Sequence, residues 1–195
     1  MYSIQSYDAT EFNLAERMPH TYFFALFPDD VVCDQILAAA DALQAAQALG
    51  GRRVARPRLH MTAHFVGRYR QPDPNIEARA IEAGERMTCA PFELVLDRAY
   101  SFPRGRGEAP GIFAPSAAPG ALLSFAAQLR DAVAAVASSP RKGVAFRPHV
   151  TWLYSVDRIL ENAIAPIAWR VAEFALAMTI PGQQRYEILR RWPLR

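Results

Sequence analysis

The chain has 195 residues, of which 51% are hydrophobic and 21% charged, a composition typical of globular proteins and not of disordered or fibrous ones. No apolar run reaches the roughly 20 residues that a membrane-spanning helix needs, and two cysteines, Cys33 and Cys89, are too few for a disulfide framework. The net charge is +3, and among 22 basic residues only Lys142 is a lysine. Arginine suits phosphate contacts, but coding bias also enriches arginine, so the charge permits a polyanionic partner without requiring one.

The first 20 residues are polar and contain no apolar signal core, so we expect a leader of uncertain order, a cytoplasmic protein and one domain over residues 21–195.

The apolar run 20–28 predicts a buried strand. Residues 29–51 begin with acidic N-cap candidates and end on two glycines, which predicts a helix. The elements predicted after it are a strand at 58–67, a helix at 74–87, a strand at 92–102, a loop at 103–111, a strand at 112–115, a helix from Pro119 to about Ser138, a strand at 146–155, a short helix or loop at 157–166, and strands at 169–180 and 184–194.

Strands and helices alternate irregularly in this order, and several strands alternate apolar with polar residues. That pattern favours antiparallel sheets with helices outside, an α+β fold. One unit occurs twice: a long helix, a basic turn with proline, and a strand that carries His-x-Thr, as in "RRVARPRLHMT" and "RKGVAFRPHVT". A duplication of this kind can place two equivalent strands side by side across a pseudo-two-fold axis.

Alternate residues of a strand share a face. His60, Thr62 and His64 are therefore expected to point one way on the first strand. On the second, the residues expected to share a face are Arg147, His149, Thr151 and Leu153. If both faces line one cleft, the set suits phosphoryl transfer without a metal: a neutral imidazole takes a proton, a protonated one gives a proton, and the hydroxyls with Arg147 hold phosphate oxygens.

A single His-x-Thr is more often a satisfied core histidine beside a β-favouring threonine. Two copies in matching contexts, which use half of the four histidines, favour function. A non-catalytic module that binds RNA or nucleotides in the same cleft is the alternative. A metal site made of His60, His64 and His149 is disfavoured, because a strand spaces the first two widely and no carboxylate or cysteine accompanies them. We expect no cofactor and no metal.

The paired "LHMT" and "PHVT" motifs resemble the signature of the two-histidine (2H) phosphoesterases. Among these the chain is most similar to the RNA 2′,3′-cyclic phosphodiesterases, also called LigT-like or 2′-5′ RNA ligases. "YFFALFPDD", "FRPHVT" and "YEILRRWPL" resemble further family segments, so the likeness runs from about Thr21 to Leu194. It implies a bilobal fold with a central cleft between two pseudo-symmetric lobes, which antiparallel sheets line and helices cover.

The resemblance also implies a reaction and its residues. The reaction is metal-independent hydrolysis of a 2′,3′-cyclic phosphate to a 2′-phosphate, with 2′-5′ ligation as a reverse reaction. His149 would be the general base, His60 the acid, and Thr62 and Thr151 phosphate ligands. The expected partners are RNA 3′ ends or cyclic nucleotides and no membrane, and the expected state is a monomer.

Three positions depart from the family pattern, namely Ala63 for leucine, His64 for a small residue and Tyr154 for arginine. His64 is a candidate to line the cleft floor, to perturb His60 or simply to pack. Phe27 and Phe113 are candidates to line the cleft and stack a base. Strand parity turns Trp152 and Tyr154 away from the His149 face, and each aromatic candidate is more often a core residue than a platform.

Overall fold

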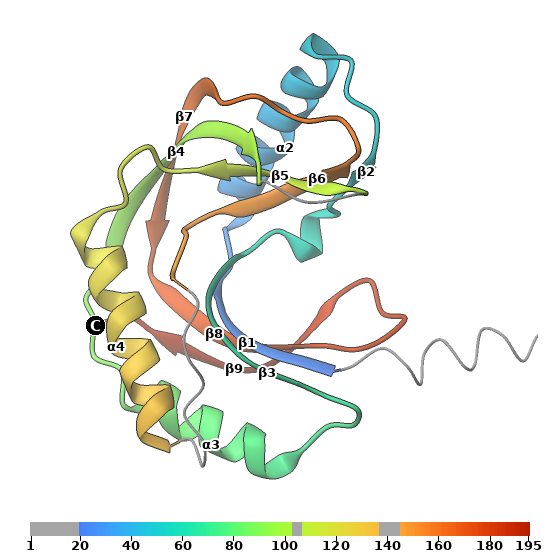
Figure 1. Ribbon diagram of the computed structural model, residues 1–195. Helices are drawn as coiled ribbons and strands as arrows, with labels where there is room; N and C mark the ends of the chain where they lie inside the picture. The colour runs from blue at the N-terminus through green and yellow to red at the C-terminus, as the bar shows by residue number, and fades with distance from the viewer. Residues whose placement is uncertain (1–19, 103–106, 137–144) are drawn as a thin grey trace, which may run out of the picture.

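The computed structural model describes residues 20–102, 107–136 and 145–195. Two antiparallel sheets lie one above the other in Figure 1, sheet A with the order β3-β1-β8-β9 and sheet B with the order β2-β6-β5-β4-β7. The predicted α+β class is therefore confirmed. The elements are β1 (His20–Leu26), α2 (Asp30–Ala46), β2 (Arg52–Arg53), a 3-10 turn (Arg56–Arg58), β3 (Met61–Tyr69), α3 (Pro74–Glu85), β4 (Phe92–Ser101), β5 (Ala109–Ala114), α4 (Gly120–Val136), β6 (Val150–Ser155), β7 (Asn162–Val171), β8 (Glu173–Thr179) and β9 (Tyr186–Pro193).

The first two helices begin where the acidic caps predict. The Asp29 carboxylate accepts a hydrogen bond from the backbone N–H of Val32 at 2.9 Å. Asp73 caps α3 in the same way, with Pro74 in the first turn. These caps satisfy N–H groups that the first helical turn leaves without partners, so the start of each helix is encoded locally.

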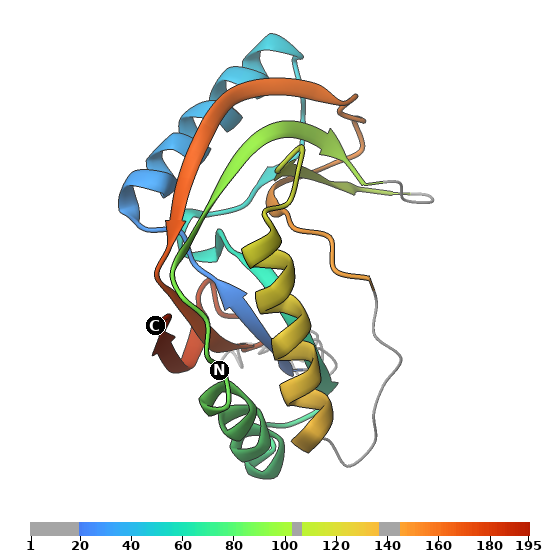
Figure 2. The same ribbon diagram turned by 90° about the vertical axis from the view of Figure 1, so that its left-hand side faces the viewer.

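The duplicated unit folds as strand, helix, strand in both copies. In the first copy β1 and β3 pair antiparallel, and in the second β5 and β6 do. The helix of the first copy, α2, contacts β6 and β7 of sheet B. The helix of the second copy, α4, contacts β3 of sheet A and also β4 of sheet B (Figures 1 and 2). These helix contacts connect the two sheets.

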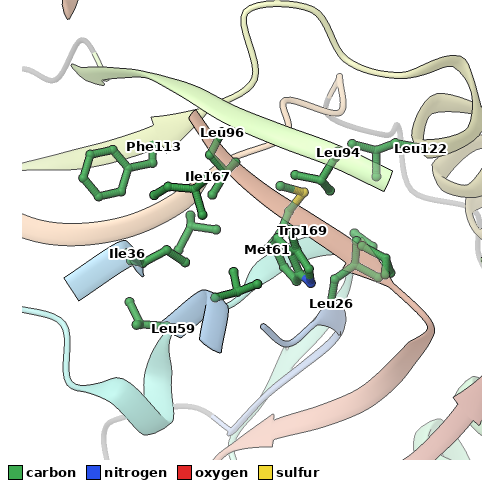
Figure 3. Close-up of a cluster of buried hydrophobic side chains, with 14 of the residues drawn as sticks. Leu26, Ile36, Leu59, Met61, Leu94, Leu96, Phe113, Leu122, Ile167 and Trp169 are labelled. Carbon is green, nitrogen blue, oxygen red and sulfur yellow. The ribbon is translucent and has the colours of Figure 1, made fainter. Parts of the chain in front are cut away.

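The main hydrophobic core lies between the sheets and the three helices. Figure 3 shows part of it, with Ile36 of α2 near Phe113, Leu96 and Ile167. Phe113 is fully buried and stacks on Trp152 with ring centroids 5.2 Å apart. Its proposed role in lining the cleft is therefore wrong: strand β5 turns this ring toward α2 and away from the histidines.

The end of the chain differs from the prediction. Residues 169–180 were expected to form one strand, but the chain leaves β7 in sheet B and enters β8 in sheet A with a break at Ala172. Residues 157–166 contain no helix, and the second half of this stretch begins β7. Three predictions concern residues wholly or partly outside the described part of the chain: the leader, the first part of the 103–111 loop, and the end of the helix predicted to reach about Ser138.

No helix in the described part of the chain is long and apolar enough to cross a membrane.

Candidate active site

His60 lies just before β3, on the face of sheet A that we call the histidine face. This face carries Phe23, Ala25 and Phe27 of the β1 segment, His60, Thr62, Phe65 and Arg68 of the β3 segment, and Tyr186 of β9. The Nδ1–H of His60 donates to the carbonyl of Arg58 at 2.8 Å. A carbonyl can only accept, so this bond places the proton on Nδ1 and leaves Nε2 as an acceptor. Nε2 lies 3.1 Å from Thr62 Oγ1, whose hydroxyl donates to it.

His149 lies just before β6 and is held in the same way. Its Nδ1–H donates to the carbonyl of Arg147 at 2.6 Å. The ring of Phe102 meets the imidazole edge to face, with centroids 4.7 Å apart. Strands β3 and β6 approach each other, so the duplication brings two Nε2 atoms with the same tautomer into one region.

Burial sets the charge of both imidazoles. It lowers the pKa of His60 to about 4, and the positive charges of His149 and Arg58 act in the same direction, while the Arg58 carbonyl opposes them. Burial also lowers the pKa of His149, against the Arg147 carbonyl. Because a charge on His149 lowers the pKa of His60, the two rings lie near each other. In the free protein at neutral pH both are therefore neutral, and each Nε2 can accept a proton.

A β-bulge in β3 moves His64 off the histidine face. Ala25 pairs with Thr62, but the next residue of β1, Phe24, pairs with His64, so β3 holds one extra residue at Ala63. Ala25 and Phe24 point to opposite faces, and their partners do too. The expectation that His64 shares a face with His60 is therefore wrong. His64 instead faces the side of α4, where burial and the charge of Arg130 lower its pKa.

A second bulge, in β6, brings Tyr154 to the side of Thr151. Ile112 pairs with Thr151 and Gly111 with Leu153, so Trp152 is the extra residue. Trp152 and Leu153 are both buried, and Tyr154 returns to the Thr151 face. The strand-parity expectation is thus wrong for Tyr154, and Trp152 is a core residue. Tyr154 lies close enough to raise the pKa of Tyr186, although burial is the larger cause of that shift.

The other predicted site residues, Phe27, Thr151 and Arg147, lie at different positions around the histidines. Phe27 lies beside His60, with ring centroids 6.0 Å apart. Thr151 is half-buried on the same side of β6 as Tyr154. Arg147 is exposed, and its positive charge reaches Tyr100, whose pKa it lowers against the larger effect of burial. Arg147 is therefore free to meet an anion, although no contact within the described residues fixes its guanidinium.

Sequence reasoning missed the rings that surround the histidines. Tyr186 meets His60 edge to face at 5.0 Å, and Phe23 lies 5.2 Å from it. The guanidinium of Arg58 lies 4.6 Å from the Tyr186 ring centre and donates to its hydroxyl at 3.4 Å. In the sequence, Phe23 belongs to the apolar run 20–28, which predicts a buried strand but no contact with His60. Tyr186 comes from β9, more than a hundred residues after His60, so no local signal linked them.

Within the described residues, no three or more His, Cys, Asp or Glu side chains converge as a metal site would require. Because His64 points to the far side of β3, the three histidines of the metal hypothesis do not share one centre.

Comparisons with known proteins found a matching family and similar folds. A family model described as the 2′-5′ RNA ligase superfamily matches residues 28–180. The fold is similar to that of E. coli LigT in its apo form, at 27% identity and a TM-score of 0.73 over 91% of this chain and 98% of that one. It is also similar to a Thermus thermophilus protein, at 23% identity and a TM-score of 0.72, over 90% and 98% of the two chains. Usb1 of Kluyveromyces marxianus shares only the fold, at 11% identity and a TM-score of 0.52 over 92% and 99%. No curated protein matches the sequence.

Proposed function

The chain belongs to the 2′-5′ RNA ligase superfamily of two-histidine phosphoesterases, and on that basis we propose that it hydrolyses 2′,3′-cyclic phosphates on RNA ends or nucleotides to 2′-phosphates. The observation that carries the proposal is the matched pair of imidazoles. His60 and His149 each donate Nδ1–H to a backbone carbonyl, so in each ring Nε2 carries the lone pair that can accept a proton. Crystal structures of E. coli LigT with 3′-AMP and with phosphate support a nucleotide substrate for this chain as well.

In the proposed reaction a water molecule attacks phosphorus opposite the 3′-oxygen. His149 Nε2 takes the proton of the water, the bond from phosphorus to the 3′-oxygen breaks, and His60 Nε2–H gives that oxygen a proton. Thr62, Thr151 and Arg147 hold the non-bridging oxygens as charge grows on them. The products are a 2′-phosphate and a 3′-hydroxyl, and no metal ion takes part.

The low pKa of His60 bears on its role as the acid. His60 is neutral in the free protein, so it must gain a proton when substrate binds. The negative charge of the bound phosphate supplies the cause, because a nearby anion raises the pKa of an imidazole. Reversal of the reaction exchanges the two roles, and joining of RNA ends through a 2′-5′ bond would use the same two groups.

The direct test is incubation with a nucleoside 2′,3′-cyclic phosphate in EDTA, followed by phosphorus NMR. We expect turnover by the parent protein and a loss of about 10²- to 10⁴-fold in His60→Ala and His149→Ala. His64→Asn is the matched control, since it alters a histidine of the same strand on the opposite face.

The alternative is a non-catalytic module that binds RNA or nucleotides. It predicts that neither the parent nor the variants form product and that all of them bind oligonucleotides alike. Absence of turnover by the parent, or turnover that both alanine variants retain, would therefore remove the enzymatic proposal.

A further inference from the structure

An arginine stands two residues before each histidine of the duplicated motif, Arg58 before His60 and Arg147 before His149. The backbone carbonyl of each arginine accepts the Nδ1–H of its histidine. The side chains differ. Arg147 is exposed, and no contact in the described residues holds its guanidinium, whereas Arg58 is half-buried and held by three contacts. The two copies are thus alike in the backbone and unequal in their arginine side chains.

The guanidinium of Arg58 joins the turn before β3 to the segment that begins β9. Its Nη1–H donates to the carbonyl oxygen of Gln183 at 3.3 Å, and its Nη2–H donates to the hydroxyl of Tyr186 at 3.4 Å. The guanidinium carbon lies 4.6 Å from the centre of the Tyr186 ring. These partners stand 125 and 128 residues after Arg58, so one side chain fixes two distant segments against each other.

The turn between β8 and β9 forms without help from Arg58. The N–H of Gln183 donates to the carbonyl of Ile180 at 3.1 Å, which closes a four-residue turn with Pro181 and Gly182 at its centre. Gly182 has a φ of +78°, which glycine adopts readily at the third position of such a turn. The turn is therefore encoded locally, and the contact with Arg58 positions it without being needed to build it.

Tyr186 connects this turn to the imidazole of His60. The two rings meet edge to face with centroids 5.0 Å apart. The Tyr186 ring also packs on Phe23 at 5.0 Å and on Phe27 at 6.2 Å. The imidazole is thus held at Nδ1 by the backbone of Arg58 and at its edge by a ring that the side chain of Arg58 holds.

The basic residues near Arg58 in the sequence have other partners. Arg53 and Arg56 form ion pairs with aspartates of α2. Arg52 lies 4.8 Å from the centre of the Tyr154 ring, but these two residues face each other because β2 pairs with β6. Arg58 has no carboxylate partner among the described residues, and its side-chain contacts all go to the segment that carries the ring beside His60.

We propose that Arg58 is a positioning residue for the proposed reaction, whose side chain clamps Tyr186 and the β8–β9 turn against the imidazole of His60. The clamp keeps the ring covered and sets a fixed positive charge beside it. Both effects lower the pKa of His60, and burial is the larger of them. Once substrate has protonated it, an imidazole in this setting is a strong acid, which suits the group that protonates the leaving oxygen. The inference rests on the proposed function and names what makes the two histidines unequal.

Arg58 is the residue through which this environment can be changed. In the described residues the titratable groups that face His60 are Arg58 from the turn, His149 from the segment before β6 and Tyr186 from β9, while β1 contributes the uncharged rings of Phe23 and Phe27. Burial lowers the pKa of His149 and raises that of Tyr186, so both are neutral at pH 7. Arg58 alone of these groups then carries a charge.

The first test compares pH profiles of kcat/KM on adenosine 2′,3′-cyclic phosphate for the parent, Arg58→Gln and Arg56→Gln. Arg58→Gln is expected to lower the maximum about 10- to 100-fold, because His60 is no longer held in place, and to move the optimum to higher pH. Arg56→Gln is the matched control, since it removes one charge from the same turn at a side chain that pairs with α2. It is expected to leave the optimum where it is. A lower maximum without a shift in Arg58→Gln would indicate a merely structural role and overturns the proposal.

Arg58→Lys separates the clamp from the charge. Lysine keeps the charge but lacks the planar fork that reaches the Gln183 carbonyl and the Tyr186 hydroxyl together. We therefore expect Arg58→Lys to shift the optimum as Arg58→Gln does. Added to Tyr186→Ala, it is expected to cause no further shift, because no ring is left to hold. A parent-like profile in Arg58→Lys, or full additivity in the double variant, refutes the clamp.

NMR titration of the His60 imidazole C–H signals tests the clamp without turnover. The pKa of His60 is expected to rise from about 4 toward 6.5 in both Arg58 variants and to stay low in Arg56→Gln. If the parent shows no turnover but these shifts occur, the proposed function fails and the clamp stands. An unchanged pKa of His60 in both Arg58 variants overturns the clamp, whatever the turnover.

Discussion

His60 and His149 are held by the same device, a hydrogen bond from Nδ1 to the carbonyl two residues earlier. Their surroundings differ. Three aromatic rings, those of Phe23, Phe27 and Tyr186, surround His60, whereas Phe102 is the ring that meets His149 in the described residues. The backbone thus sets the tautomer of each imidazole alike, and the side chains around it decide how strongly its charged form is disfavoured.

The pH dependence of turnover should reflect these surroundings. Burial lowers the pKa of both imidazoles, so the optimum of kcat/KM, which reports the free protein, is expected below the value of about 6.5 of an unperturbed imidazole. The optimum of kcat is expected at higher pH, because bound phosphate raises both pKa values. Rates on a cyclic phosphate at saturating and at limiting substrate give both profiles. An optimum of kcat/KM above about pH 7 would contradict the burial of the pair.

The same burial predicts acid destabilisation. The pKa of His60 is about 4 in the folded protein and 6.5 when unperturbed. The unfolded chain therefore binds more protons between these values, and stability falls as pH decreases through that window. Between about pH 7 and about pH 4.5 the loss due to His60 is about 2 kcal/mol. Urea unfolding of the parent and of His60→Asn at both pH values measures this loss of unfolding free energy. The variant should lose less stability on acidification, and an equal loss in both proteins refutes the prediction.

Tyr186 should control the pKa of His60. Its ring shields the imidazole from water, so Tyr186→Ala is expected to raise the pKa of His60 toward 6.5, while Tyr186→Phe, which keeps the ring, leaves it low. Titration of the imidazole C–H signals by NMR reports this directly. If both variants shift the pKa alike, the hydroxyl and its contact with Arg58 matter more than the ring does.

His64 should be dispensable for catalysis. The bulge at Ala63 turns it toward α4, away from His60. We expect His64→Asn to keep kcat/KM within about twofold of the parent, because the changed side chain lies on the opposite face of β3 from His60. A loss comparable with that of His60→Ala would place His64 on the histidine face and would contradict the observed register.

Gly51 should be required for the position of β2. Its φ of +116° is a conformation that other residues rarely adopt, and a Cβ there would lie 2.4 Å from the carbonyl oxygen of Tyr154. Gly51→Ala is expected to cost about 1–3 kcal/mol of unfolding free energy and to displace Arg52 from the Tyr154 ring. Gly120→Ala is the matched control, because a Cβ at Gly120 meets nothing within 4 Å. Urea unfolding measures the free energy of unfolding of both variants. If Gly51→Ala is as stable as Gly120→Ala, the predicted strain at Gly51 is refuted.

Much of the fold and the identity of the motif were accessible from the chain itself. The acidic caps Asp29 and Asp73 mark the first turns of their helices through contacts only a few residues long. The duplicated His-x-Thr can be found by aligning two segments of the chain with each other. Its resemblance to the two-histidine phosphoesterases is confirmed by the family model that matches the sequence. The roles of the individual site residues remain predictions.

The tertiary structure alone decided which side chains share a face. Simple alternation placed His64 with His60 and turned Tyr154 away from Thr151, and both expectations failed for the same reason. A bulge depends on how a strand pairs with its neighbour, here β3 with β1 and β6 with β5, and that register is set by packing between segments distant in the chain. The ring of Tyr186 reaches His60 only because β9 joins sheet A. The sequence by itself therefore determined the paired His-x-Thr motif and the family, and the pairing of distant strands determined what surrounds the motif.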